Sequence, residues 1–189
     1  MKNRVTPSGT IVDIAQRGTL MGNRGVIHRD HDIVRPWQVK RWIACALEFR
    51  GWRAPMWEPG RWTALFFLDE AVALAAGHRP CALCRHADYV RFQAAWAVAI
   101  GGSTRADDMD RRLHVDRLEG RAQRVHQAAW PSLPDRVFVA VGDRACCVAG
   151  DRVLPWGIAG YGEPVARPRR GQAAVLTPRA MVGVLSAGY

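Results

Sequence analysis

The stretch from Leu65 to Phe92 constrains the fold of this chain more than any other, because it joins three structural signals without a break. An aromatic and aliphatic run opens the stretch and predicts a short strand. Asp69 then offers a side-chain oxygen to cap a helix, and Gly77 is the residue type that most readily adopts the left-handed conformation that ends one. The next residues read HRPCALC. We therefore expect a strand, a short helix and a pair of cysteines to form one local unit.

Cys81 and Cys84 form a Cys-x-x-Cys pair at the end of this unit. Three chemistries use that spacing: half of a tetrahedral zinc site, a dithiol redox pair, or a buried turn with no special chemistry. Redox pairs usually open a helix after a strand, with an aromatic residue and a Gly-Pro or Gly-His spacer. Here the pair follows a helix and the spacer is Ala82-Leu83. The sequence therefore favours zinc, and the buried turn is the alternative.

The same stretch resembles the second half of the zinc-binding domain of the Ada family of DNA repair and regulatory proteins. The resemblance covers residues 65–85 and includes the spacing from an aromatic pair to the first cysteine. The matching residues are Phe66, Phe67, Glu70, Ala75, Ala76, Gly77, Arg79, Pro80, Cys81, Cys84 and Arg85. The resemblance implies four cysteine ligands, one of which accepts a methyl group from a DNA phosphotriester. This chain lacks the upstream Cys-x-x-x-Cys pair of the family, and His78 stands where the family usually has Phe or Tyr.

The other cysteines are Cys45 and the adjacent pair Cys146-Cys147. Five is an odd number and adjacent cysteines strain badly to bridge each other, so a secreted disulfide framework is not expected. Cys45 lies in an apolar segment, residues 42–49, that reads as a strand. It is either a core residue of that strand or a third zinc ligand. We expect Cys146 and Cys147 to be small packed residues of a hairpin.

The sequence HRDHD, which starts at His28, offers candidates for a fourth zinc ligand. Short polar clusters after strands are often solvated turns, which is the alternative for this one. Neutral imidazole is the group that best accompanies thiolates on zinc. We therefore expect His28 to complete the site, with His31 as the second choice.

The chain carries a formal net charge of +10, almost all of its basic residues being Arg. Such a surplus favours polyanions, because each phosphate contact releases counterions. Arg-rich composition that merely follows a GC-rich genome is the alternative. Tryptophans interleave with arginines in residues 50–62, a pattern that binds unpaired nucleic acid or simply caps a small core. The residues expected to contact nucleic acid are Arg50, Arg53, Arg61, Arg79 and Arg85.

The pattern of elements predicts an α+β protein in which a small zinc-stabilised N-terminal β/α module precedes helices and a C-terminal part rich in β-hairpins. We expect helices over 87–100 and 104–118, a hairpin over 137–149 and a last helix from Pro178. A rigid linker at 130–134 is the best candidate for a boundary. The expected parts are therefore residues 1–100, 101–130 and 131–189, although all three can belong to one domain.

These signals predict a cytoplasmic zinc protein that binds nucleic acid, DNA rather than RNA, in a repair or regulatory role. No apolar run reaches the roughly 18 residues of a membrane helix, and no signal peptide is recognised at the start. Two alternatives remain open. One is an enzyme that transfers an alkyl group to Cys45 or hydrolyses a substrate at an open zinc position. The other is a zinc-stabilised module for protein interaction.

Overall fold

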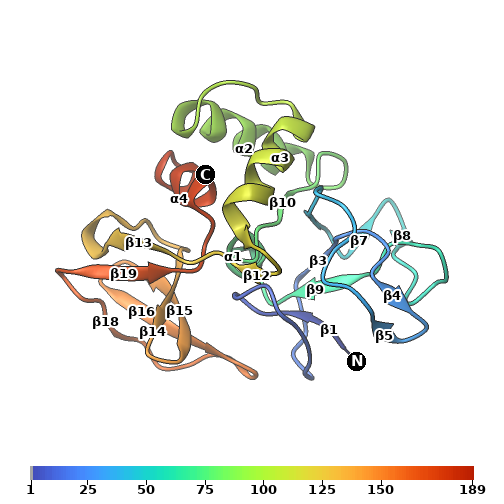
Figure 1. The fold of residues 1–189 in the computed structure, drawn as a ribbon, viewed down its shortest axis with the longest axis horizontal. Coiled ribbons are helices and arrows are strands. Elements are labelled where there is room, and N and C mark those ends of the chain that lie inside the picture. Colours follow the sequence, from blue (N-terminus) through green and yellow to red (C-terminus); the bar gives the residue numbers. More distant parts are fainter. Residues whose placement is uncertain (1) are drawn as a thin grey trace.

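The computed structural model describes residues 2–189 and places two β-sheets on either side of a short central helix (Figure 1). The N-terminal sheet contains, in spatial order, β10 (Arg79–Pro80), β6 (Ile43–Cys45), β3 (Leu20–Asn23), β9 (Leu65–Phe67), β1 (Lys2–Val5) and β2 (Ile11–Asp13). The C-terminal sheet contains β13 (His126–Ala129), β19 (Gln172–Val175), β14 (Phe138–Val141), β15 (Arg144–Ala149), β16 (Arg152–Gly157) and β17 (Gly160–Tyr161), and β18 (Val165–Ala166) also pairs with β16.

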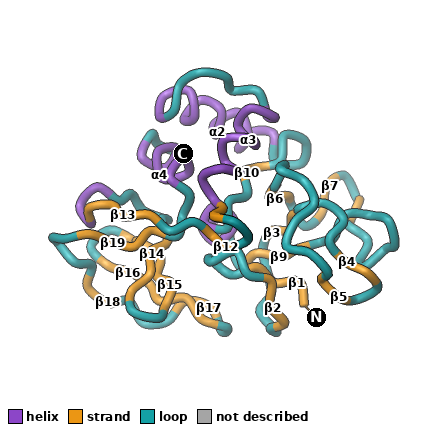
Figure 2. Tube along the Cα trace, in the orientation of Figure 1, coloured by secondary structure: helices purple, strands orange, loops and turns teal. Residues whose placement is uncertain are grey.

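Three two-stranded hairpins extend from these sheets. They are β4 (His28–Arg29) with β5 (Asp32–Ile33), β7 (Glu48–Phe49) with β8 (Trp52–Arg53), and β11 (Leu118–Glu119) with β12 (Ala122–Gln123). The helices are α1 (Glu70–Ala75), α2 (His86–Ala99), α3 (Ala106–Arg117) and α4 (Arg179–Ser186), with a 3-10 turn at Trp130–Ser132. Figure 2 shows α2, α3 and α4 gathered at the top of the view, and α4 contacts both of the others. The predicted α+β class is confirmed.

The central helix α1 begins and ends as its sequence predicts. The Asp69 carboxylate accepts a hydrogen bond of 2.9 Å from the backbone N–H of Val72, and Gly77 has a φ of 83°. Gly77 is also required for space, because a Cβ there would lie 2.6 Å from Cδ of Arg117. The side chains of residues 71–75 are all buried. The helix therefore serves as a shared core element between the two sheets.

The apolar core crosses the boundary that we expected at residue 100. One cluster combines residues of α2, such as Phe92 and Trp96, with Met109 of α3 and Val139 of the C-terminal sheet. A second cluster combines α1 and the N-terminal sheet with residues of the C-terminal sheet, including Phe138. Since α2 packs on α4, the last helix in the chain, the first hundred residues do not bury their apolar surface alone.

Two local expectations differ from the structure. Residues 42–49 form two separate strands, β6 and β7, because the second joins β8 in a hairpin and leaves Leu47 41% exposed. The expected linker at 130–134 forms a 3-10 turn whose Trp130 side chain is buried in the apolar cluster that contains α2. The segment that was expected to separate two parts of the chain therefore contributes a buried aromatic side chain to their common core.

Candidate metal centre

The pairing of two short parallel strands brings Cys45 to the Cys-x-x-Cys pair. Strand β6 pairs with β10 so that Ala44 lies opposite Pro80. The backbone N–H of Cys81 then donates to the carbonyl of Ala44 over 3.0 Å, which continues the ladder by one residue. Cys45 ends one strand and Cys81 follows the other, so their side chains meet at the same end of the sheet. A separation of 36 residues in sequence becomes a direct contact.

The three sulfurs of Cys45, Cys81 and Cys84 all lie within 4.8 Å of one another. Three thiolates on one tetrahedral zinc ion at about 2.3 Å each would have sulfurs about 3.8 Å apart, so the group needs only a small contraction. The backbone N–H of Leu83 donates to the sulfur of Cys81 over 3.4 Å. Such donors stabilise a thiolate. These three cysteines could hold a metal ion.

The pKa values of the three thiols differ because one thiol donates a hydrogen bond to another and because the three are buried to different extents. The pKa of Cys81 falls to about 5, chiefly because the Cys45 thiol donates a hydrogen bond to it and despite the opposing effect of burial. The pKa of Cys45 is raised by that same bond, with burial as the next cause. The pKa of Cys84 is raised mainly by burial. The group therefore already favours one thiolate, at Cys81, without a metal.

The structure does not bring His28 into this group. In the part of the chain that the structure describes, the three cysteines are the only set of three or more potential ligands close enough for one metal ion. The Nδ1 atom of His28 lies 2.7 Å from the hydroxyl of Thr63, and its ring packs edge-on against Trp57. His31 also contacts Trp57. Both histidines belong to the β4–β5 hairpin, and their rings contact Trp57 in the loop after β8.

Two of the arginines expected to contact nucleic acid are engaged inside the protein. Arg79 is 2% exposed, and its Nε and Nη2 atoms both donate to the carboxylate of Asp110, over 2.9 and 2.8 Å. Arg85 pairs with Glu70 and with Asp88. The side chains next to the cysteines thus anchor the loop that carries Cys81 and Cys84 to the helices, because β10 leads through this loop directly into α2. Neither presents its guanidinium freely to a phosphate.

Arg50, Arg53 and Arg61 are exposed on the outer arm formed by β7, β8 and the following loop. Arg53 pairs with Glu48 over 2.6 Å and Arg61 with Glu58 over 3.5 Å. Arg50 instead lies over the ring of Phe49, with its guanidinium carbon 5.1 Å from the ring centroid. Exposed ion pairs of this kind contribute little and exchange easily, so these arginines remain accessible to an anion.

An apolar pocket of about 520 Å³ lies over the cysteine group, a feature that the sequence alone did not reveal. All three cysteines line it, and its other walls include Phe49, Trp52 and Trp62. The two indole rings have centroids 6.1 Å apart, and Trp52 is 49% exposed. The side of the cysteine group without a protein ligand therefore faces an aromatic pocket. The interleaving of Trp with Arg in residues 50–62 was the signal for this wall.

Comparisons with protein-family models, with curated proteins and with solved structures find no match to this chain. The function of the chain is therefore inferred from the geometry of the cysteine group and of the side chains around it. In residues 2–189 no helix is both long and apolar enough to cross a membrane.

Proposed function

We propose that Cys45, Cys81 and Cys84 bind one zinc ion and that the aromatic and basic face around it binds nucleic acid. The observation that carries the zinc proposal is the convergence of three sulfurs within 4.8 Å, from two segments of the chain. Thiolates are preferred zinc ligands, and a three-thiolate set excludes the hard cations Mg²⁺ and Ca²⁺. The short elements around the group, β7 and β8, have little core of their own. A metal would hold the loops together there.

The proposal of nucleic-acid binding rests on the chemistry of the outer arm. Trp52 exposes half of its surface beside Trp62, and bases stack on such indole faces. Arg50 and Arg53 are exposed on the same hairpin and can contact phosphates. We favour unpaired DNA, because stacking requires bases that are free of the duplex. The role would be in repair or regulation, as the Ada resemblance implies.

Zinc content tests the first part of the proposal. We expect one zinc per purified chain by plasma mass spectrometry, and less than about a tenth of that in Cys81→Ser and Cys84→Ser, since loss of a thiolate ligand removes most of the binding free energy. Cys146→Ser is the matched control, because this cysteine lies outside the group. His28→Ala should retain its zinc. Full zinc content in Cys81→Ser would refute the site.

Salt-dependent binding tests the second part. We expect a labelled single-stranded DNA to bind in fluorescence anisotropy, and Trp52→Ala to cost about 1–3 kcal/mol through lost stacking. Arg50→Ala should lower the slope of log K against log salt by about 0.7 for a single strand. Arg169→Ala, in the loop after β18, removes the same charge elsewhere and serves as the control. Equal effects of the two arginine changes would show that binding follows net charge alone.

The second candidate function is chemistry at the metal, and the absence of a fourth protein ligand within residues 2–189 favours it. Zinc with three protein ligands keeps a position for water or substrate, as catalytic sites do. In the form that the Ada resemblance implies, the thiolate of Cys45 would form a bond to the methyl carbon of a DNA phosphotriester; the methyl–oxygen bond would break and the phosphodiester anion would leave. Intact mass after exposure to a methylated DNA phosphotriester tests this: a stable gain of about 14 Da on a cysteine of the group supports transfer. No gain, together with full zinc content, would leave the binding role.

A further inference from the structure

Two buried arginines, Arg24 and Arg117, both contact the ring of Trp42, away from the cysteine group. Arg24 follows β3 and is 2% exposed, and Arg117 ends α3 and is 1% exposed. Their guanidinium carbons lie 3.9 and 4.0 Å from the ring of Trp42. Burial of a cation is costly unless a counter-charge compensates it. Both guanidinium charges therefore need a neutralising partner.

Within residues 2–189, the hydrogen-bond acceptors of both arginines are all neutral. Arg24 donates to Nε2 of His78 over 3.3 Å and to the carbonyl of Gly9 over 2.9 Å. Arg117 donates to the carbonyls of Gly77 and Lys40, and its Nη2 atom lies 3.0 Å from Nδ1 of His114. Neither forms an ion pair with a carboxylate of residues 2–189. The Nη2 atom of Arg24 and the Nε atom of Arg117 are buried with no hydrogen-bond partner in that range. Each arginine thus keeps one buried donor that the described residues leave unsatisfied.

Burial also shifts the ionisation of both groups. It lowers the pKa of Arg24 to about 9, and it lowers the pKa of Arg117, with the charge of Arg24 as a further cause. The nearest acid on α3, Asp110, is already engaged by the bidentate contact with Arg79. An external anion would relieve the desolvation and the mutual repulsion together.

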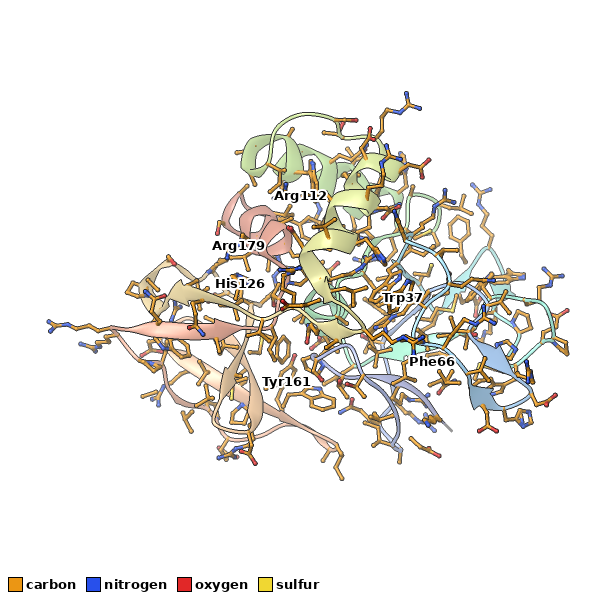
Figure 3. The ribbon with its side chains drawn as sticks, in the orientation of Figure 1. Trp37, Phe66, Arg112, His126, Tyr161 and Arg179 are labelled. Atoms are coloured by element: carbon orange, nitrogen blue, oxygen red, sulfur yellow. The ribbon has the colours of Figure 1, made fainter. Side chains whose placement is uncertain are left out.

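A cavity of about 630 Å³ opens onto these arginines between α3, the β11–β12 hairpin and the N-terminal strands. Its basic lining residues are Lys2, Arg24, Arg35, Arg117 and Arg121, and its lining includes no Asp or Glu. Trp37 lies beside α3 at this cavity (Figure 3), where its ring meets that of His114 with centroids 5.6 Å apart. Trp37, Trp42, Ile11 and Ile33 supply an apolar wall. The volume suits a small organic molecule.

We propose that this cavity binds a small organic anion, with its phosphate or carboxylate held by Arg24 and Arg117 and its apolar body against Trp37 and Ile33. The planar guanidinium forks match both of these oxyanions. Lys2 and Arg121 lie at the exposed rim of the cavity, where their positive charges attract the anion. The site is distinct from the cysteine group and does not depend on zinc or on nucleic-acid binding.

Isothermal titration with phenyl phosphate, phenylacetate and inorganic phosphate tests the proposal. We expect saturable binding of at least one of the two aromatic anions, more tightly than inorganic phosphate, because only the former use the apolar wall. Arg24→Gln should weaken that binding about tenfold or more, since it removes a charge-assisted hydrogen bond in a buried site. Comparison of phenyl phosphate with phenylacetate separates the two anion types.

Two exposed residues keep the test decisive if Arg24→Gln fails to fold. Arg121→Ala, at the rim, should weaken binding about threefold, whereas Arg124→Ala on the same segment should leave it unchanged because Arg124 does not line the cavity. Equal losses in these two variants would overturn the proposal, as would binding of inorganic phosphate alone. Binding of an oligonucleotide that depends on Arg24, with no binding of either aromatic anion, would overturn it in favour of a nucleic-acid site.

Discussion

The chain uses cysteine in two contrasting ways, and the contrast separates a site from a core. Cys146 and Cys147 are neighbours on β15, and because side chains alternate along a strand they enter different apolar clusters. Cys45 and Cys81 are far apart in sequence, yet strand pairing brings their sulfurs together with that of Cys84. Because Cys146 and Cys147 are adjacent on one strand, their side chains point to opposite faces. The pairing of β6 with β10 instead brings Cys45 to the Cys81–Cys84 pair. A metal site needs the second arrangement.

Thiol reactivity should give the largest difference between the two sets. In metal-free protein at pH 7, Cys81 exists mainly as thiolate because its pKa lies near 5, whereas burial raises the pKa of Cys147 to about 12. We expect iodoacetamide to modify Cys81 at least about a hundredfold faster, since the thiolate is the nucleophile. Peptide mass spectrometry after timed quenching measures both rates. The reaction at Cys81 should persist down to about pH 5 and slow when zinc is added; similar rates for the two cysteines would remove the contrast.

Metal removal should affect stability through the cysteine group alone. At a zinc concentration a thousandfold above Kd, binding stabilises the folded chain by about 4 kcal/mol, and chelation should remove this increment from the free energy of unfolding measured in urea. Cys146→Ser should keep the full zinc-dependent increment, and Cys84→Ser should lose it. An increment that Cys146→Ser also abolishes would show that the C-terminal cysteines take part in metal binding.

Asp110→Ala should weaken the attachment of the Cys81–Cys84 loop to α3, because Asp110 pairs with Arg79 just before that loop. Cys146 and Cys147 depend on no such ion pair among the described residues. The change leaves the charge of Arg79 buried without its partner, and we expect the free energy of unfolding to fall by about 3 kcal/mol. The double change Arg79→Met with Asp110→Leu should recover much of that loss, because it leaves no unpaired charge. Asp107→Ala, on the same helix as Asp110, breaks an exposed pair with Arg41; it is the control and should cost far less. A double variant as unstable as the single one would argue against this account.

The smallest effects should come from the packed cysteines themselves. Cys146→Ala and Cys147→Ala each remove one buried sulfur, and we expect each to cost about 1 kcal/mol. Because the two side chains enter different clusters, the costs in the double variant should add to within about 0.5 kcal/mol in denaturant unfolding. A coupling well above that value would show that the two clusters respond as one.

Local elements follow from the sequence because neighbouring residues encode them. Asp69 and Gly77 fix the ends of α1, and the Cys-x-x-Cys pair is visible in four residues. The hairpin of β14 and β15 likewise forms between two apolar runs on either side of a tight turn at Gly142. These features hold in the structure, since capping, turn conformation and strand alternation depend on residues only a few positions apart.

Tertiary structure alone decided which distant residues meet. The sequence offered Cys45 either as a core residue or as a ligand, and the parallel register of β6 and β10 places it beside Cys81. The same long-range packing leaves His28 in its own hairpin, buries Arg79 against Asp110 and brings Arg24 and Arg117 to the lining of one cavity. Charge and residue type can be read from single positions in the sequence, but burial and interaction partners depend on how distant segments pack together. The sequence by itself therefore determined the cysteine motif and the basic surplus, and the fold decided which thiols lie together and which arginines are buried.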